Sequence, residues 1–426
     1  MTDKKLSERI HKLLINNMEK GGGGGKPHFH FTRPSPERYP YQFFWDTCFH
    51  VFILCVLEEP KMAQKHLRSL FAFQEDNGFV GHMIYWDRLK PGRFTDIFQS
   101  HPSFRNLYKS HMSALIQPPM AAQAVERVHE ISEDSQFLEE MYPKLKAQFD
   151  WLAKNRDFDG DGLLTIISPF ESGMDWKPTF DVPLGFKPQK ANKKLFWKVV
   201  GVDFRNYVNN YNLKKIRKKG YFLVKEVGLN SIYAQNLRVM AKLADLMDDQ
   251  DSAKYHELAL KVEKSILNLM YSQEDAAFYD CYGKNNKQIK VLTPTIFYPV
   301  VLESIPTEVS EKVMKKHFFK SDEFHTDFPI PSLATNEPAF DAGASMYIWR
   351  GPTWIVNNWY LHKYLVQQDY EKEAKHLVES IKALIEKSGF REYYDPFTGE
   401  GHGARNFTWC GLVLDMIKAE KETAGK

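Results

Sequence analysis

The segment 171–178 (ESGMDWKP) places two carboxylic acids, Glu171 and Asp175, four residues apart beside a tryptophan. Asp175 stands between Met174 and Trp176, and apolar neighbours disfavour the charged form of an acid. An acid that stays protonated near neutral pH can donate its proton to a glycosidic oxygen. The tryptophan suits the same chemistry, because an aromatic plane covers the C–H face of a sugar ring. An acid beside a tryptophan is common, so this interpretation depends on the rest of the chain.

Two further acids, Glu392 and Glu400, lie in the segment 391–401 (REYYDPFTGEG). Hydrolysis of a glycoside with inversion needs a base on the opposite face of the sugar from the acid, about 6.5–9.5 Å away, so that a water molecule fits between them. Carboxylates delivered by different loops across a cleft meet that need, and both glutamates are candidates for the base. Spacing alone favours the alternative, in which Glu392 and Arg391 are solvated loop charges.

The segment 157–162 (DFDGDG) has acids at the first, third and fifth positions of a calcium-binding loop and glycine at the sixth. The twelfth position, which should carry a bidentate acid, is Ser168, so a turn held by Asx and glycine conformations is the favoured interpretation. The chain contains neither HExxH nor GxSxG, so a catalytic metal and a serine hydrolase are both unsupported. We expect no metal and no cofactor.

A glycine run, Gly21–Gly25, follows a helix predicted over residues 2–19. Gly25 and Lys26 resemble the end of a phosphate-binding loop, but Lys20 stands where the first glycine should be and Pro27 replaces the hydroxyl residue. A nucleotide site is therefore not expected. A flexible loop that closes over a ligand is the functional interpretation, and a plain linker is the alternative.

Composition excludes several classes of partner. The 426 residues include 57 Lys and Arg and 54 Asp and Glu, so a formal charge of +3 predicts no nucleic acid or other polyanion as partner. Aromatic residues make up 14% of the chain, and many stand in polar stretches, which favours a ligand-lined cleft. No secretory signal or membrane span is visible, and the four cysteines form no CxxC pair. We therefore expect a soluble cytoplasmic protein with reduced thiols.

The helical patterns that must position these residues come in pairs, each an apolar segment followed by a more amphipathic one. The pairs are 41–58 with 60–76, 109–131 with 134–155, 222–248 with 250–271, 294–303 with 308–318, 351–367 with 369–388, and 405–421 with the N-terminal helix. Six hairpins with a buried inner ring and an amphipathic outer ring predict an all-α fold, an (α/α)6 toroid in which loops gather at one mouth. An open α-solenoid is the alternative, but its repeats should resemble one another, and these do not.

Two connections, near 78–108 and 156–221, are too long to be turns. They are rich in aromatic residues, unlike disordered linkers, so we expect ordered walls of a cleft. The chain is thus predicted to be a single catalytic domain over residues 1–426 with two inserted loops.

Five blocks of the sequence resemble glycoside hydrolase family 63 and, more distantly, the trehalase family. The blocks are 45–50 (WDTCFH), 159–163 (DGDGL), 171–175 (ESGMD), 347–354 (YIWRGPTW), and 392–395 (EYYD) continued by 398–401 (TGEG). They occur in the family's order and span nearly the whole chain. The absence of room for an additional β-rich N-terminal domain makes the chain most similar to the bacterial mannosylglycerate and glucosylglycerate hydrolases within the family.

The resemblance implies an inverting α-glycosidase of the (α/α)6 fold that acts on a small glycoside. Asp175 would be the general acid and Glu392 the general base, with Glu171 in support and Glu400 the less favoured base. The residues implied around the sugar are Trp45, Asp46, Trp176, Trp349, Arg350 and Trp354. A trehalase-like enzyme or a general α-glucosidase acting on neutral disaccharides is the alternative.

The resemblance also implies that an arginine and tyrosines on loops hold the glycerate carboxylate. The matching positions are Arg205 and Tyr211, with Gln117 and Tyr39 nearby. A guanidinium group suits a carboxylate, since it donates two parallel hydrogen bonds. Arg205 also lies among many lysines, so a surface position is the alternative.

Overall fold

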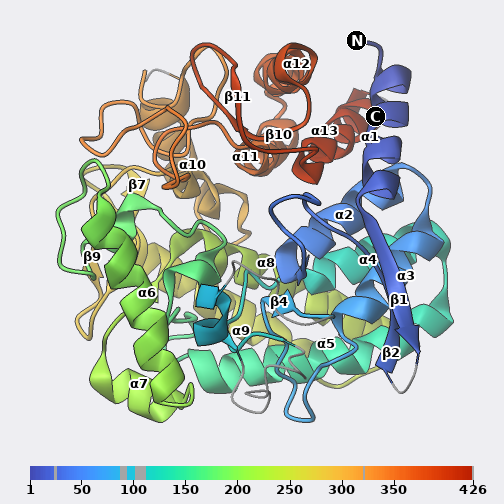
Figure 1. Cartoon of the computed structure of the whole chain (residues 1–426), viewed down its shortest axis with the longest axis horizontal. Coiled ribbons are helices and arrows are strands. Elements are labelled where there is room, and N and C mark those ends of the chain that lie inside the picture. Colours follow the sequence, from blue (N-terminus) through green and yellow to red (C-terminus); the bar gives the residue numbers. More distant parts are fainter. Residues whose placement is uncertain (24–25, 87–93, 101–111, 320–321, 425–426) are drawn as a thin grey trace.

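The computed structural model describes residues 1–23, 26–86, 94–100, 112–319 and 322–424. Most of these residues are helical, and four of the predicted helix pairs form (Figure 1). These pairs are α2 (Phe44–Val56) with α3 (Pro60–Leu70), α4 (Ala121–Ser132) with α5 (Ser135–Arg156), α8 (Val227–Leu246) with α9 (Ser252–Ser265), and α11 (Ile355–Gln367) with α12 (Glu371–Ser388).

The two members of a pair differ in burial as their sequences predict. Helix α12 buries one stripe that includes Leu377, Ile381 and Leu384, and Gly389 ends it with φ of +74°. Helix α11 is buried over most of its surface, including Trp359 and Tyr360. A helix that is apolar on most sides must be covered on most sides, so α11 lies inside and α12 outside.

Two helices differ from their predicted bounds because of prolines. The segment 294–303 forms two short 3-10 turns, η6 (Pro294–Phe297) and η7 (Pro299–Val301), before α10 (Thr307–Met314) and a π-helical turn, η8 (Lys315–Phe319). A proline lacks the backbone N–H that an α-helix needs, so prolines five residues apart prevent a continuous helix here. Helix α4 begins at Ala121 rather than near 109, directly after Pro118 and Pro119, and residues 109–111 lie outside the described part.

The ends of the chain meet at one edge of the molecule (Figure 1). Helix α1 (Asp3–Asn16) contacts η9 (Thr408–Gly411), the turn that leads into α13 (Leu412–Ala424). Lys421 Nζ donates to Asp3 Oδ2 at 3.0 Å. Around the inside, α2 contacts α4, α4 contacts α8, and α8 contacts η6; η6 then contacts α11, α11 contacts α13, and α13 returns to α2. The inner elements therefore form a closed cycle.

The prediction of an all-α fold was too simple, because the described residues also form five small antiparallel sheets. They pair β1 (Met18–Gly23) with β2 (Lys26–Thr32), β3 (Gln42–Phe43) with β4 (Met83–Ile84), β8 (Cys281–Tyr282) with β5 (Val224–Lys225) and β9 (Lys287–Gln288), β6 (Tyr271–Ser272) with β7 (Ala277–Phe278), and β10 (Arg391–Tyr394) with β11 (Gly401–Arg405). Most of these strands are two residues long. They brace the long connections rather than form a layer of their own.

The glycine run belongs to the β1–β2 hairpin, which packs against α3 on the outside of the molecule. Gly22 has φ of +109°, and a Cβ atom there would lie 2.5 Å from the backbone oxygen of Pro27, so the hairpin needs glycine at that position. Gly24 and Gly25 lie outside the described residues. The described part of the run is thus a strand, and neither the flexible loop nor the linker describes it.

The second long connection carries most of the inserted structure. It contains η3 (Pro169–Ser172), η4 (Pro178–Asp181), α6 (Lys193–Val208) and α7 (Leu213–Lys219), and α6 and α7 form one flank of the molecule in Figure 1. Helix α6 packs against η1 (Phe94–Gln99) of the first long connection. None of the described helices is long and apolar enough to cross a membrane. All four cysteines are free, as predicted, and all four are buried.

Candidate active site

A cavity of about 310 Å³ opens where the two long connections meet the starts of the inner helices. Most of the predicted site residues line it, namely Tyr39, Trp45, Asp46, Gln117, Asp175, Trp176, Trp349 and Trp354. The other lining residues include His82 and Phe98 of the first connection and Phe170, Phe196 and Asp203 of the second. Parts of both connections are therefore cleft walls, as predicted.

Asp175 follows a tight turn that begins at η3. Gly173 has φ of +74°, and a Cβ atom there would overlap the ring of Trp45. Only glycine combines that backbone conformation with so close an approach, so the turn fixes Asp175 against the tryptophan wall. Burial, with smaller contributions from the charges of Glu392 and Asp203, raises the pKa of Asp175 to about 7, although Arg38 acts in the opposite direction. The carboxyl group can thus carry a proton near neutral pH.

A buried ion cluster holds the other end of this loop. The Lys177 ammonium group is 1% exposed and pairs with Glu226, at the start of α8, and with Asp280 at 2.8 Å. The two carboxylates raise the pKa of Lys177 despite its burial, which keeps the side chain charged. Because α8 belongs to the inner cycle of helices, this cluster ties the Asp175 loop to the rigid part of the fold.

Glu392 lies on β10 and is almost fully buried. Its Oε1 accepts a hydrogen bond from the Tyr39 hydroxyl at 2.5 Å, and its Oε2 accepts from Arg38 at 3.0 Å and from the backbone N–H of Ala404 at 2.6 Å. Glu392 does not itself line the cavity, but its hydrogen-bond partner Tyr39 does. Glu400 is exposed in the turn between β10 and β11.

Stacked indole rings form one wall of the cavity. The rings of Trp349 and Trp354 are parallel, with centroids 3.8 Å apart, and Trp45 meets Trp409 edge to face at 5.1 Å. Asp46 accepts a hydrogen bond from Trp409 Nε1 at 2.9 Å, and burial raises its pKa to about 7. An aromatic floor with a carboxyl group at its edge is the usual surface for a hexose ring.

Gln117 fixes the start of α2 beside this wall. Its Oε1 accepts from the backbone N–H of Trp45 at 3.2 Å.

Trp409 was not among the predicted site residues, although this residue stands in the stretch 407–410 directly after the β10–β11 hairpin. The two aromatic residues Phe407 and Trp409, which follow the hairpin that carries Glu392, were the signal available in the sequence.

A further carboxyl group, Asp203, also lines the cavity and was not among the predicted site residues. Its Oδ1 accepts from Ser168 Oγ at 2.6 Å and its Oδ2 from Gln99 Nε2 at 2.9 Å. Burial raises its pKa to about 7. Asp203, Phe196 and Val200 share one face of α6 and all line the cavity. That helical spacing could have identified the residue.

Two predicted contact residues are buried without lining the cavity. Arg350 is buried in an ion pair with Asp181, one hydrogen bond of which measures 3.0 Å, so it braces η4 instead of lining the cavity. Tyr211 donates its hydroxyl proton to the Phe98 carbonyl at 2.5 Å and is also not a lining residue.

Arg205 lies at the surface and is not among the residues that line the cavity. It is exposed and stacks over the ring of Tyr221 at 5.1 Å. Residues two apart on a helix point about 200° from each other, so Arg205 turns away from the face that carries Asp203.

Glu171 supports the loop from inside the core. It is fully buried, pairs with Arg156, and accepts from the backbone N–H groups of Ile116 at 2.9 Å and Ile167 at 2.7 Å. These contacts join α5, the loop before α4 and the start of the inserted connection, so Glu171 holds the walls of the cavity in place.

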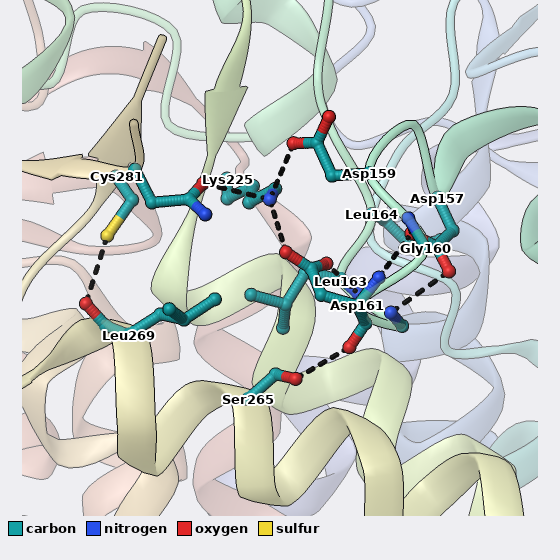
Figure 2. A network of polar contacts seen from close by, with 12 residues as sticks. Asp157, Asp159, Gly160, Asp161, Leu163, Leu164, Lys225, Ser265, Leu269 and Cys281 are labelled. Atoms are coloured by element: carbon teal, nitrogen blue, oxygen red, sulfur yellow. Dashed lines mark hydrogen bonds and ion pairs between the residues drawn. The ribbon is translucent and has the colours of Figure 1, made fainter. Parts of the chain in front are cut away.

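Lys225 of β5 lies against the acids of the segment 157–162 (Figure 2). Lys225 Nζ lies 2.8 Å from Asp159 Oδ2 and 2.5 Å from Asp161 Oδ2, and Asp157 accepts three backbone N–H bonds, from 160, 161 and 162. An ammonium group already neutralises the acids, which agrees with the turn rather than with calcium. Among the described residues, no group of three or more His, Cys, Asp or Glu side chains could hold a metal ion.

Comparison with known proteins identifies the family. Residues 39–410 match the model of the mannosylglycerate hydrolase MGH1-like glycoside hydrolase domain. The chain is 27% identical to a mannosylglycerate hydrolase of Rubrobacter radiotolerans over 91% of this chain and 93% of that protein, and 23% identical to a glucosylglycerate hydrolase of Mycolicibacterium hassiacum over 91% and 94%.

Solved structures agree with the sequence matches. The crystal structure of the family 63 mannosylglycerate hydrolase from Thermus thermophilus superimposes with a TM-score of 0.84 at 25% identity, over 97% of this chain and 100% of that one. Neutral trehalase Nth1 from Saccharomyces cerevisiae shares the fold alone, with a TM-score of 0.60 at 15% identity over 98% of this chain and 81% of that one. The chain therefore belongs to the MGH1-like branch of glycoside hydrolase family 63 and is an O-glycosyl hydrolase.

Proposed function

We propose that the protein hydrolyses an α-glycoside of glycerate, mannosylglycerate or glucosylglycerate, with inversion at the anomeric carbon. The observation that carries the proposal is the difference between two carboxyl groups: Asp175, which lines the cavity, and Glu392, which lies behind the lining residue Tyr39 and bonds to it. Burial raises the pKa of Asp175 to about 7, whereas Glu392 accepts three hydrogen bonds, including one from Arg38. One group is suited to give a proton and the other to take one.

The mechanism follows from these roles. The hexose ring lies against Trp349 and Trp354, and Asp46 binds its hydroxyl groups. Asp175 donates its proton to the glycosidic oxygen as the bond to the anomeric carbon breaks. Glu392 takes a proton from the water molecule that attacks the opposite face, and Tyr39 holds Glu392 in position. The products are the β-hexose and the free aglycone, and one displacement completes the reaction.

The identity of the aglycone is inferred from the relatives. Two of them are named for mannosylglycerate and glucosylglycerate, and one similar crystal structure, with a TM-score of 0.83 at 25% identity, is of the Thermus enzyme with Tris and D-glycerate. The chain covers 93% and 94% of those two relatives, so it has room for the same reaction.

The finer architecture is part of the proposal. The closed cycle of inner elements and the outer partners of four of them support an (α/α)6 toroid. One hydrophobic core extends from Leu6 to Ile417, which supports a single catalytic domain over residues 1–426. The free, buried cysteines support a cytoplasmic location.

The test is incubation of the purified protein with mannosylglycerate, glucosylglycerate, trehalose and maltose, with released hexose as the readout. Hydrolysis confined to the two glycerate glycosides is expected. Preference for trehalose or maltose would establish the trehalase-like alternative. Proton NMR in the first minutes should show the β-anomer of the hexose first, and an α-anomer appearing first would exclude inversion.

A further inference from the structure

The base candidate Glu392 has a cationic partner, Arg38, which lies just before β3. Arg38 Nη1 donates to Glu392 Oε2 at 3.0 Å. The Glu392 side chain is fully buried, whereas 42% of the Arg38 side chain is exposed. Arg38 therefore reaches from the solvent to a carboxylate that is itself closed to solvent.

The hydrogen bonds to Glu392 are divided unequally between its two oxygens. Oε2 accepts from Arg38 and from the backbone N–H of Ala404, at 3.0 and 2.6 Å, and Oε1 accepts from the Tyr39 hydroxyl at 2.5 Å. Each carboxylate oxygen has two lone pairs, so the described donors fill those of Oε2 and leave one lone pair on Oε1. Oε1 is therefore the oxygen that can take a proton.

The surroundings of Glu392 hold it in this orientation. Gly403 of β11 has φ of +66°, and a Cβ atom there would overlap Glu392 Oε2, so the strand backbone lies directly against that oxygen. The Arg38 guanidinium group also lies over the ring of Tyr39, 5.7 Å from its centroid. Arg38 thus contacts both the carboxylate and the phenol that binds its other oxygen.

The charge of Arg38 acts on the acid as well as on the base. Burial raises the pKa of Asp175, the charge of Glu392 adds to this effect, and the charge of Arg38 opposes it. Two carboxyl groups that act on each other do not lose their protons independently. A cation hydrogen-bonded to Glu392 favours the state in which Glu392 is ionised and the proton stays on Asp175.

We propose that Arg38 is a positioning residue for the base: it keeps Glu392 ionised and leaves Oε1 free to take the proton. In the reaction an O–H bond of the attacking water breaks, its proton goes to Glu392 Oε1, and its oxygen bonds to the anomeric carbon as the leaving group departs. The inference rests on the proposed function, because it concerns the base of the same reaction.

Other groups near Glu392 also carry charge or titrate. They are Tyr39, Asp46 of α2, Asp175 of the turn after η3, Arg391 and Tyr393 of β10, and His402 of β11. Burial raises the pKa of both phenols, so these stay protonated. All of these groups remain when Arg38 is replaced, so a difference between the wild type and an Arg38 variant reports the loss of Arg38.

The test uses α-glucosyl and α-mannosyl fluoride as substrates. Fluoride needs little protonation as it leaves, so the low-pH limb of the rate reports the base rather than Asp175. We would measure kcat and KM from about pH 4.5 to 8 in the wild type, Arg38→Ala, Arg38→Lys and Arg68→Ala. Arg68 is the matched control, because its side chain is 41% exposed and pairs at 2.8 Å with Glu140, which is itself 40% exposed.

In Arg38→Ala the low-pH limb of kcat/KM should move to higher pH by about one unit, because a carboxylate that loses its cation takes up a proton more readily. At the acidic end this is a loss of about tenfold in kcat, with KM changed less than about twofold, since Arg38 is not among the described lining residues of the cavity. Arg38→Lys keeps the charge and should keep the wild-type limb, and Arg68→Ala should match the wild type.

Added guanidinium ions provide a second readout. Because the Arg38 side chain is partly exposed, its vacated place is open to solvent, and guanidinium at concentrations far below those that unfold proteins should restore part of the lost kcat in Arg38→Ala. The same addition should leave Arg68→Ala unchanged.

An unmoved low-pH limb in Arg38→Ala, or the same upward move in Arg38→Lys, would overturn the proposal. A loss that is equal at every pH and does not respond to guanidinium would mark Arg38 as a structural support and would also overturn it. Arg38→Gln is a second neutral variant should Arg38→Ala fail to fold. A wild type that hydrolyses the fluorides but neither glycerate glycoside would refute the proposed substrate and still test the role of Arg38.

Discussion

Replacing Asp175 with asparagine should remove activity only where the leaving group needs a proton. Glycerate leaves as a poor, alkoxide-like group, and general acid catalysis contributes about 10²–10⁴ to such steps. We expect kcat/KM for the glycerate glycoside to fall by about 10³ in Asp175→Asn. An α-hexosyl fluoride leaves as fluoride and needs little protonation, so its kcat/KM should fall less than about tenfold.

The pH profile gives a second measure of the same residue. Burial raises the pKa of Asp175 to about 7. Above that pH the protonated fraction falls tenfold for each pH unit, so the wild-type kcat/KM for the glycerate glycoside should fall about tenfold between pH 7.5 and 8.5. Asp175→Asn acting on the fluoride should lack this alkaline decline, because no acid remains to be titrated.

The assay is release of hexose and of fluoride ion by wild type, Asp175→Asn and Glu392→Gln over this pH range. Glu392→Gln is the matched comparison, because the attacking water needs a base with either substrate, and both rates should fall together. Equal losses on the two substrates in Asp175→Asn would refute its role as the acid. An alkaline decline that persists in that variant would assign the titration to another carboxyl group.

Three further predictions concern the supports of the site. Gly173→Ala should lower the free energy of unfolding by ~2–4 kcal/mol and reduce turnover, because the new Cβ meets Trp45. Gly220→Ala, at φ of +63° with no atom within 4 Å, should lower the free energy of unfolding by only ~1–2 kcal/mol. Equal losses of the two variants in urea titrations would contradict this. Lys177→Met leaves two buried carboxylates without their cation and should lower the free energy of unfolding by ~3–5 kcal/mol. Lys146→Met removes the half-exposed ion pairs with Asp249 and Asp251 and should lower the free energy of unfolding by at most ~1 kcal/mol. Asp203 has its pKa raised from 3.8 to about 7, so the folded state holds a proton that the unfolded state releases, and the contribution of this one group to wild-type stability should decline by up to ~4 kcal/mol as the pH rises from 4 to 8. Chemical denaturation of Asp203→Asn should show a smaller decline, and an unchanged one would show that Asp203 does not titrate in this range.

The fold was predictable where burial left a periodic pattern. The stripe of α12 and the nearly all-round apolar surface of α11 gave correct pairs, because solvent on one face selects polar residues there. The fourth inner segment, 294–303, has the apolar composition of a helix but carries Pro294 and Pro299. The apolar composition of this segment does not reflect the two backbone N–H groups that its prolines lack. The two-residue strands are too short to show an alternating hydrophobic pattern.

The acid and the base differed in how far sequence could identify them. Asp175, its apolar neighbours and the turn glycine stand within one short segment, so local chemistry was enough. Glu392 and Glu400 both stand in the stretch before the last inner helix, and only the family resemblance favoured the former. The structure separates them: Glu392 bonds to Tyr39 and Arg38, 353 and 354 positions earlier in the chain, and Glu400 is exposed. No local pattern records such a contact.

Arg205 shows why the aglycone side is harder to predict than the catalytic centre. The family resemblance pointed to this arginine on the inserted segment, but the face of α6 that turns inward depends on the register of the whole helix. The buried residues of α6 include Asp203 and exclude Arg205; they are Leu195, Val199, Val202, Asp203 and Asn206. A helical wheel of 193–208, drawn before assigning the carboxylate ligand, would have favoured Asp203 as the residue inside.

The two sides of the cavity come from different parts of the fold, and this division bears on specificity. The indole wall, Asp175 and Glu392 are tied to the inner cycle through α2, α8, α11 and the β10–β11 hairpin that precedes α13. Other described lining residues, including Asp96 and Asp203, come from η1 and α6, which belong to the inserted connections and contact one another. Insertions on a closed helical ring can change without disturbing its core, because their contacts with the ring are few. We therefore expect enzymes of this fold that share the hexose but differ in aglycone to differ in these two connections, and exchange of η1 and α6 together, rather than of either alone, to transfer the preference.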